Sequence, residues 1–278
     1  MVLFLSWVIS EGVGEKMLEK KLRMAVPDWK WLIHPNRWSV ADILRKAGVG
    51  EYTIDESRGD ATFLVSPQLL GVEVVKPRRM PSEIVGGDYD CGITARDCFK
   101  NAHLSNLDEL IDLKCGYVDL VFMTNSERWN EVEKRMKEEK SKIRDLISLL
   151  KYPSLGKLDR FLIYYGMLDK KVVCASEYHN IADDFLLLKQ KELSRYTQFQ
   201  YSVKESRNDT ESCLFSVGDD RADIIFETMA TGEHSSEKGL EILEIADNST
   251  TRLYSKSHLK NPTNDVEKWK KEQNVLYI

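Results

Sequence analysis

Apolar and β-branched residues gather in short runs along the chain, and polar turns separate these runs. Runs of about four to eight such residues, alternating with helical patterns, predict an α/β fold with largely parallel sheets. We expect strands at Leu22–Val26, Gly71–Val75, Tyr89–Thr94 and Tyr117–Met123. A second series of strands and helices is expected between Val172 and Phe226. The pattern therefore predicts two lobes, each with its own sheet.

The clearest helical pattern runs from Ser126 to Tyr152. Thr124 lies just before this pattern and Glu127 lies three residues later, which is the spacing of a capping box. Apolar residues then recur at helical spacing, at Trp129, Val132, Met136, Ile143, Ile147 and Leu150. The opposite face is charged, which is typical of a solvent-exposed face. A lid or an oligomer contact is the alternative interpretation of this helix.

The segment from Arg221 to Leu240 predicts a buried strand, a small-residue turn and a new helix. Such a turn leaves backbone N–H groups unpaired at a helix start, where the macrodipole also favours an anion. Glu227, at the end of the strand, is placed to accept hydrogen bonds from the vicinal hydroxyls of a ribose. The pattern therefore favours a ribose 5-phosphate group as ligand, although an ordinary capped helix start has the same pattern. The residues that fit the phosphate cradle are Thr231, Gly232, Ser235 and Ser236.

Four segments in chain order resemble the motifs of ATP phosphoribosyltransferases, the enzymes that open histidine biosynthesis. Residues 222–240 are similar to A-D-x-I-V-D-x-V-x-T-G-x-T-L-R-x-N-G-L, with Glu227 in place of the family's ribose-binding aspartate. Residues 80–97 resemble D-I-P-x-Y-V-x-x-G-x-x-D-L-G-I-T-G-x-D, residues 172–185 resemble V-A-T-x-Y-P-N-L-x-x-x-Y-F, and residues 22–27 resemble L-R-I-A-L-P. The resemblance covers roughly residues 21–262.

This resemblance implies a two-lobed type II periplasmic-binding-protein-like fold with a ligand cleft between the lobes. It implies attack of adenine N1 of ATP on C1 of phosphoribosyl pyrophosphate, with Mg²⁺ carried by the substrate and no metal site in the protein itself. Glu227 is the implied catalytic residue. The implied phosphoribosyl-binding residues are Thr228, Ala230, Thr231, Gly232, Glu233, His234, Ser235 and Ser236. The implied nucleotide- or pyrophosphate-binding residues are Lys30, Gly92, Thr94, Asp97 and Tyr178.

The chain also departs from the family motifs. His234, Ser236 and Lys238 replace a threonine, an arginine and an asparagine of the phosphate turn, and His179 replaces a proline. After the first strand, residues 28–31 read Asp-Trp-Lys-Trp where the family reads Lys-Gly-Arg-Leu. Two alternatives to an active enzyme therefore stay open: a non-catalytic, nucleotide-binding paralogue, and a small-molecule binding protein of the same fold.

The same comparison sets the expected domain boundaries. Residues 21–122 and 239–262 form the expected first lobe, and residues 123–238 form the second lobe with a helical insertion near 126–152. Residues 1–20 are expected to be an N-terminal extension and 263–278 a C-terminal tail. Homo-oligomerisation or an accessory regulatory subunit is a further expectation.

Composition restricts the class of partner. The formal net charge is −5 and the pI is near 5.7, which gives no broad electrostatic reason to bind nucleic acid or an anionic membrane. Phosphate binding must therefore be local. The five cysteines are odd in number and form no Cys-x-x-Cys pair, so reduced thiols in a cytoplasmic protein are expected. The apolar run Val2–Ile9 is too short to span a bilayer and lacks the features of a signal peptide.

Overall fold

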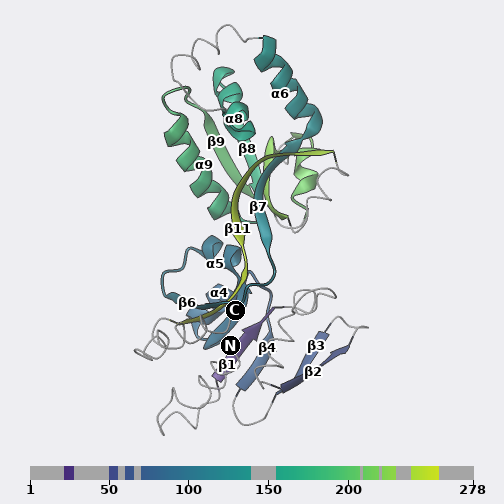
Figure 1. The fold of residues 1–278 in the computed structure, drawn as a ribbon, viewed down its shortest axis with the longest axis vertical. Coiled ribbons are helices and arrows are strands. Elements are labelled where there is room, and N and C mark those ends of the chain that lie inside the picture. The colour runs from purple at the N-terminus through teal and green to yellow at the C-terminus, as the bar shows by residue number, and fades with distance from the viewer. Residues whose placement is uncertain are drawn as a thin grey trace, which may run out of the picture. The chain divides into compact units, whose positions relative to one another are not determined.

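The structure is a computed structural model, and it describes residues 22–27, 50–55, 60–65, 70–138, 155–206, 209–218, 221–229 and 239–256. Contacts along the chain divide the protein into two compact units (Figure 1). The first unit comprises residues 1–116 and 250–278, and the second comprises residues 117–249. The predicted N-terminal extension, the C-terminal tail and residues 139–154 of the helical insertion lie outside the described residues.

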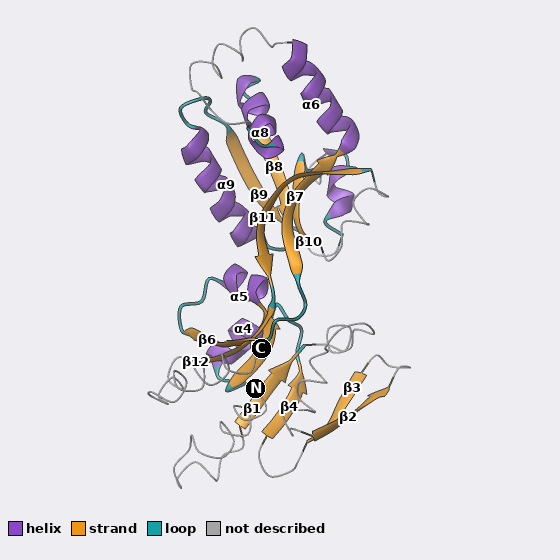
Figure 2. Cartoon of the chain, in the orientation of Figure 1, coloured by secondary structure: helices purple, strands orange, loops and turns teal. Residues whose placement is uncertain are grey.

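The first unit is built on a five-stranded mixed sheet (Figure 2). Its strand order is β4 (Leu70–Val74), β1 (Leu22–Val26), β5 (Cys91–Ala95), β12 (Thr251–Lys256) and β6 (Leu107–Asp112). β1 pairs in parallel with β4 and β5, whereas β12 is antiparallel to both of its neighbours. Strands β2 (Gly50–Asp55) and β3 (Asp60–Val65) form a separate antiparallel pair.

Helix α4 (Met80–Gly86) contributes to the core of this unit, and helix α5 (Arg96–Ala102) follows β5 directly. A side chain at Gly92 would place its Cβ 2.8 Å from Met80 Sδ and 2.9 Å from Ile84 Cδ1. A side chain at this position would therefore displace the Met80 and Ile84 side chains, because α4 packs closely over β5. The core cluster comprises Ala25, Val75, Met80, Ile84, Tyr89, Leu107 and Tyr254.

The second unit repeats this plan, because four strands of its sheet run in one direction and one strand runs against them. Its strand order is β11 (Leu240–Ser249), β7 (Val118–Asn125), β10 (Ile224–Met229), β8 (Lys171–Ser176) and β9 (Gln200–Glu205). β8 is parallel to β9 and β10, and β7 is antiparallel to β10 and β11. Helices α6 (Ser126–Glu138), α8 (Lys157–Met167) and α9 (His179–Leu193) and a 3₁₀ turn, η1 (Glu211–Leu214), complete the unit.

Aromatic rings hold the second sheet against its helices. Phe122 of β7 lies 4.6 Å from Phe226 of β10 and 5.2 Å from Phe185 of α9, measured between ring centroids. Phe122 and Phe226 are both fully buried. The alternate face of β10 places Ile225 in a second cluster with Val121, Ala175 and Leu214. The apolar run predicted as a buried strand is therefore buried on both faces.

The chain passes between the units at residues 116–117 and again at 249–250. Gly116 has φ = 63°, and a Cβ there would lie 2.5 Å from Thr251 Oγ1, so the crossing requires glycine. The strand expected at Tyr117–Met123 falls in the second unit as β7, because it pairs with β10 and β11. β11 also stays in the second unit, and the chain returns to the first unit only with β12.

The start of α6 differs from the predicted capping box. β7 extends to Asn125, and the Asn125 side-chain oxygen accepts the Glu127 backbone N–H at 2.7 Å. The Thr124 hydroxyl instead donates to the Asp223 carbonyl oxygen at 2.7 Å. Asn125 therefore caps the helix and the assignment of Thr124 was wrong. None of the helices in the described segments has both the length and the apolar character that crossing a membrane requires.

Candidate functional site

Three strands of the second unit end at one edge of its sheet. β9, β8 and β10 run parallel, and Ser176 at the end of β8 lies opposite Glu205 on one side and Phe226 on the other. Ligands of open α/β sheets bind at the carboxyl ends of such strands. Glu227 and Thr228 lie at this edge, beside the loop that carries Tyr178.

Glu227 is held in place by its own neighbour. Its Oε1 atom accepts the Thr228 backbone N–H at 2.9 Å and the Thr228 hydroxyl at 3.2 Å. Both residues are half-buried, and the Glu227 Oε2 atom has no partner among the described residues. A carboxylate with one oxygen fixed and the other available can accept hydrogen bonds from a ligand's hydroxyl groups.

The Ser176 hydroxyl connects the β8 end to β10. It donates to the Phe226 carbonyl oxygen at 2.7 Å and accepts the Tyr178 backbone N–H at 2.8 Å, and Ser176 is fully buried. Tyr178 is 4% exposed and directly precedes α9. The turn before α9 is therefore fixed beside Glu227. The sequence patterns did not single out Ser176, although a hydroxyl at the end of a buried strand was the available signal.

The matched motif residue Asp223 lies at the other end of β10 and has a structural role. Its Oδ2 atom accepts the Val173 backbone N–H at 2.9 Å, and its Oδ1 atom accepts from the Tyr165 hydroxyl at 3.2 Å and from Arg128 Nη1 at 3.3 Å. Arg128 also donates to the Ala222 carbonyl oxygen at 2.8 Å. Burial and the Asp223 charge raise the pKa of Tyr165 well above its usual range, so its hydroxyl stays protonated as a donor. Asp223 therefore joins β8, β10, α6 and α8.

The first unit contains the other described residues of the predicted site. Thr94 and Asp97 lie at the end of β5 and the start of α5, and each is 1% exposed. The Thr94 hydroxyl donates to the Pro77 carbonyl oxygen at 3.1 Å. Gly92 lies inside β5, where its contact with α4 accounts for the absence of a side chain. Thr94 and Gly92 therefore both make contacts that support the fold of this unit.

The remaining predicted site residues, Lys30 and residues 230–236 (Ala230, Thr231, Gly232, Glu233, His234, Ser235 and Ser236), lie outside the described residues. The helix expected after the phosphate turn falls in the same segment. Within the described segments, no group of three or more His, Cys, Asp or Glu side chains is placed to hold a metal ion. Burial raises the pKa of the Cys174 thiol well above its usual range, so this cysteine is a neutral core residue.

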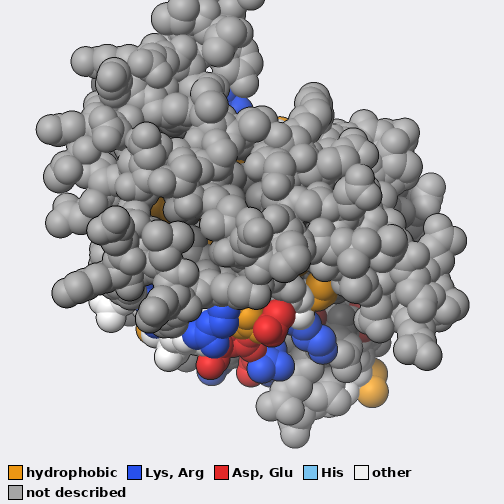
Figure 3. Space-filling model, turned by 90° about the horizontal axis from the view of Figure 1, so that it is seen from below, with side chains coloured by type: hydrophobic (Ala, Val, Ile, Leu, Met, Phe, Trp, Pro, Cys, Tyr) orange, Lys and Arg blue, Asp and Glu red, His pale blue; other side chains and the backbone are white. Residues whose placement is uncertain are grey.

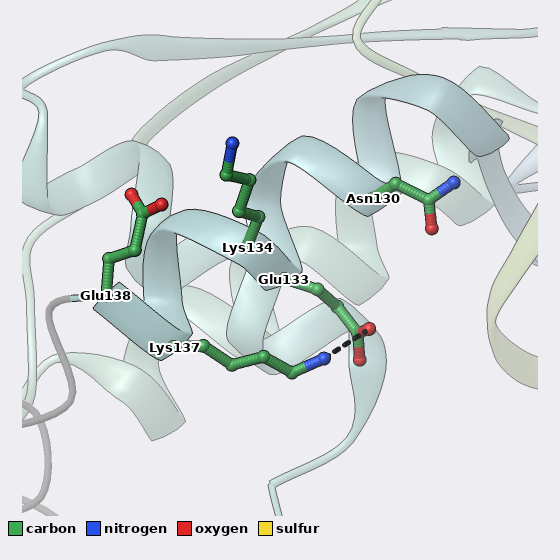
Figure 4. Close-up of a pocket in the computed structure, with 5 residues that line it drawn as sticks. All are labelled: Asn130, Glu133, Lys134, Lys137 and Glu138. Atoms are coloured by element: carbon green, nitrogen blue, oxygen red, sulfur yellow. Dashed lines mark hydrogen bonds and ion pairs between the residues drawn. The ribbon is translucent and has the colours of Figure 1, made fainter.

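A surface hollow of about 430 Å³ lies on α6 (Figure 4). Lys137 and Glu133, which both line it, form an ion pair of 3.3 Å, and Lys134 points away from that pair. Its lining residues are Asn130, Glu133, Lys134, Lys137 and Glu138. Mixed charge on one helix face is typical of a solvated surface. Basic and acidic side chains also lie side by side in one cluster on the face drawn in Figure 3.

Solved structures of more than one kind of protein resemble this chain. A search of curated proteins finds no match. Among solved structures, an ATP phosphoribosyl transferase (HisG:HisZ) complex from Thermotoga maritima is 16% identical, with a TM-score of 0.52, covering 91% of this chain and 98% of that one. Arginine-bound ArgBP from T. maritima is 9% identical with a TM-score of 0.42, covering 92% of this chain and 99% of that one.

The predicted fold class, a two-lobed α/β fold of the type II periplasmic-binding-protein kind, is confirmed. The sequence model of HisG, described as ATP phosphoribosyltransferase, matches residues 76–273, which is most of the chain. That matched region contains the predicted site residues of the first unit, such as Thr94, and those of the second unit, such as Glu227. The protein therefore belongs to the ATP phosphoribosyltransferase family.

Proposed function

We propose that this protein transfers the phosphoribosyl group of phosphoribosyl pyrophosphate to adenine N1 of ATP, the first step of histidine biosynthesis. The single observation that carries the proposal is the fixed Glu227 carboxylate at the carboxyl end of β10, on the N-terminal side of the residues in which the sequence predicts the phosphate turn. Family membership supports the same reaction. Phosphate contacts from Thr231 and Gly232 are part of the proposal.

The reaction needs no covalent nucleophile on the protein. The lone pair of adenine N1 attacks C1 of the ribose, and the bond from C1 to the pyrophosphate oxygen breaks with its electron pair leaving on pyrophosphate. Positive charge grows on the ribose ring in the transition state. Glu227 accepts hydrogen bonds from the ribose hydroxyls, which orients the sugar and places negative charge near the ring. Mg²⁺ bound to the substrate offsets the charge that grows on the leaving group.

Substrate binding tests this assignment without requiring turnover. Glu227→Gln keeps the size of the side chain and replaces charged acceptors by neutral ones, so calorimetry should find phosphoribosyl pyrophosphate bound at least about tenfold more weakly. Glu131→Gln, which removes one carboxylate from the exposed face of α6 in the same unit, is the matched control and should bind like the parent. Parent-like affinity in Glu227→Gln would remove Glu227 from the site.

A non-catalytic role is the second candidate, because residues 28–31 lack the family's Lys-Gly-Arg and His234 replaces a threonine. Binding of both substrates with no product would support this alternative. The Thermotoga structure is of a HisG:HisZ complex, so an accessory subunit or a homo-oligomer is proposed here too. Light scattering of the pure protein, which gives the molar mass in solution, tests self-association. A mass equal to the monomer at working concentrations would contradict the homo-oligomer.

A further inference from the structure

A run of positive charge follows β4 in the first unit. Lys76, Arg78 and Arg79 occupy three of four consecutive positions, and residues 75–82 contain no acidic side chain. All three cations are exposed, and the Arg79 side chain is 72% exposed. The whole chain carries a net charge of −5, so this run is a local reversal of the overall charge. We call residues 76–79 the basic loop.

The basic loop lies at the carboxyl edge of the first sheet. β4 and β5 both run parallel to β1, so the segment after β4 and the segment after β5 lie at the same edge. Small ligands of open α/β sheets collect at that edge. The loop after β4 therefore shares its edge with Thr94 and Asp97.

Thr94 fixes the conformation of the basic loop. Its buried hydroxyl donates to the Pro77 carbonyl oxygen at 3.1 Å, and the Arg79 backbone N–H closes the turn on the Lys76 carbonyl oxygen at 2.9 Å. Pro77 itself restricts its own φ. The three cations thus project from a turn that is bonded to the end of β5, which reduces the ordering needed when an anion binds.

Two side chains of the basic loop, those of Lys76 and Arg79, are available to an anion. Arg79 pairs with Glu83 at 2.6 Å, one turn along α4, and such solvated pairs contribute little and are readily replaced. The Lys76 ammonium group has no hydrogen-bond or ion-pair partner among the described residues. Guanidinium groups bind phosphate oxygens in a bidentate manner, and an ammonium group adds a compact charge.

We propose that the basic loop binds linked phosphates, as the di- or triphosphate-binding element of the first unit. Thr94 is a positioning residue in this account. The inference rests on the proposed function only for the natural source of the phosphates, which is either the pyrophosphate group of phosphoribosyl pyrophosphate or the triphosphate of ATP.

The first test uses inorganic pyrophosphate and tripolyphosphate with the full chain in calorimetry. The double variant Arg78→Gln/Arg79→Gln should bind both at least about tenfold more weakly, because charge-assisted hydrogen bonds are lost. The control Lys134→Gln/Arg135→Gln also removes two positive charges, but from the exposed face of α6, and it should bind like the parent. Binding by the parent should weaken as salt is raised.

A second pair of variants tests the positioning role. Thr94→Val removes the hydroxyl and keeps the shape, so pyrophosphate binding should weaken, whereas Thr94→Ser keeps the donor and should restore it. Equal binding by Thr94→Val and the parent would remove Thr94 from the account. A parent that binds neither anion, or a loop variant that binds both as the parent does, would overturn the proposal.

The natural source is decided by comparing ATP with phosphoribosyl pyrophosphate in the loop variant. A loss confined to ATP assigns the triphosphate, and a loss confined to phosphoribosyl pyrophosphate assigns the pyrophosphate group. Ribose 5-phosphate tests the Glu227 site independently of the basic loop, because it lacks linked phosphates. Its binding should depend on Glu227 and be unaffected in the loop variant, so failure of the proposed function is distinguishable from failure of the basic-loop assignment.

Discussion

The Oδ2 atom of Asp223 accepts the backbone N–H of Val173 at 2.9 Å, while the Asp223 N–H donates to the Val173 carbonyl oxygen at 2.7 Å. This reciprocal contact fixes the register of β10 against β8. Because Ser176 and Phe226 lie three residues further along the same parallel pair, the register set by Asp223 decides where Glu227 emerges at the carboxyl edge. The scaffold residue and the candidate site residue therefore lie at opposite ends of one strand.

Removing the Asp223 carboxylate should destabilise the second unit. Asp223→Ala leaves Arg128, whose side chain is 13% exposed, without its acidic partner, and it also removes the acceptor for Val173. We expect a loss of about 2–4 kcal/mol in the free energy of unfolding, measured in urea. Asp223→Asn should lose less, because its amide oxygen can still accept one N–H. A change below about 0.5 kcal/mol in Asp223→Ala would contradict the structural role of this residue.

How far the sequence could predict the molecule depends on the range of the interactions. The strand Leu22–Val26 was predicted and is confirmed, because an apolar run bounded by a proline is a local signal. The contacts of Asp223 with Arg128 and Val173 span 95 and 50 residues, and no local pattern reveals them. Sequence comparison marked Asp223 as a motif residue without distinguishing its structural role.

The unit boundaries illustrate the same limit. The strand Tyr117–Met123 follows β6 closely along the chain, and sequence order therefore favoured placing both in one lobe. Pairing with β10 and β11, which are distant in sequence, places β7 in the second unit. Similarly, β12 lies between β5 and β6 in the first sheet although it follows β11 along the chain. The phosphate turn itself was predicted from its small residues and stays a prediction.

Glu244 should give the second unit a measurable dependence on pH. Burial raises the pKa of this carboxyl group above its usual value of 4.5, against the lowering effect of its 2.9 Å ion pair with Lys189. Its Oε2 atom is buried with no hydrogen-bond partner among the described residues. A raised pKa in the folded state means that Glu244 contributes stability below pH 4.5 and that this contribution is lost as the pH rises through the folded pKa.

The measurement is urea unfolding of the parent and of Glu244→Gln from pH 4 to pH 7. The difference in unfolding free energy, parent minus variant, should decrease as the pH rises from about 4.5, because the glutamine cannot ionise. Taking the difference cancels the other carboxyl groups. A difference that increases with pH would show that the Lys189 pair outweighs desolvation.

Gly92→Ala separates packing from ligand binding at a position that the family motif includes. The new methyl group would lie within 3 Å of Met80 and Ile84 side-chain atoms, so these side chains must shift. We expect a loss of roughly 1–3 kcal/mol in thermal unfolding, with the affinity for phosphoribosyl pyrophosphate unchanged in the folded variant. Loss of affinity with unchanged stability would instead place Gly92 in the binding site.

Product formation tests the proposed transferase activity itself. The pure protein is incubated with ATP, phosphoribosyl pyrophosphate and Mg²⁺, and pyrophosphate release and the coupled nucleotide are followed together by mass spectrometry, for the parent and for Glu227→Gln. The proposed transfer should yield one phosphoribosyl-ATP for each pyrophosphate in the parent, and a rate lower by at least about tenfold in Glu227→Gln. Absence of the coupled nucleotide with the parent, while both substrates bind, would contradict the proposed transferase activity.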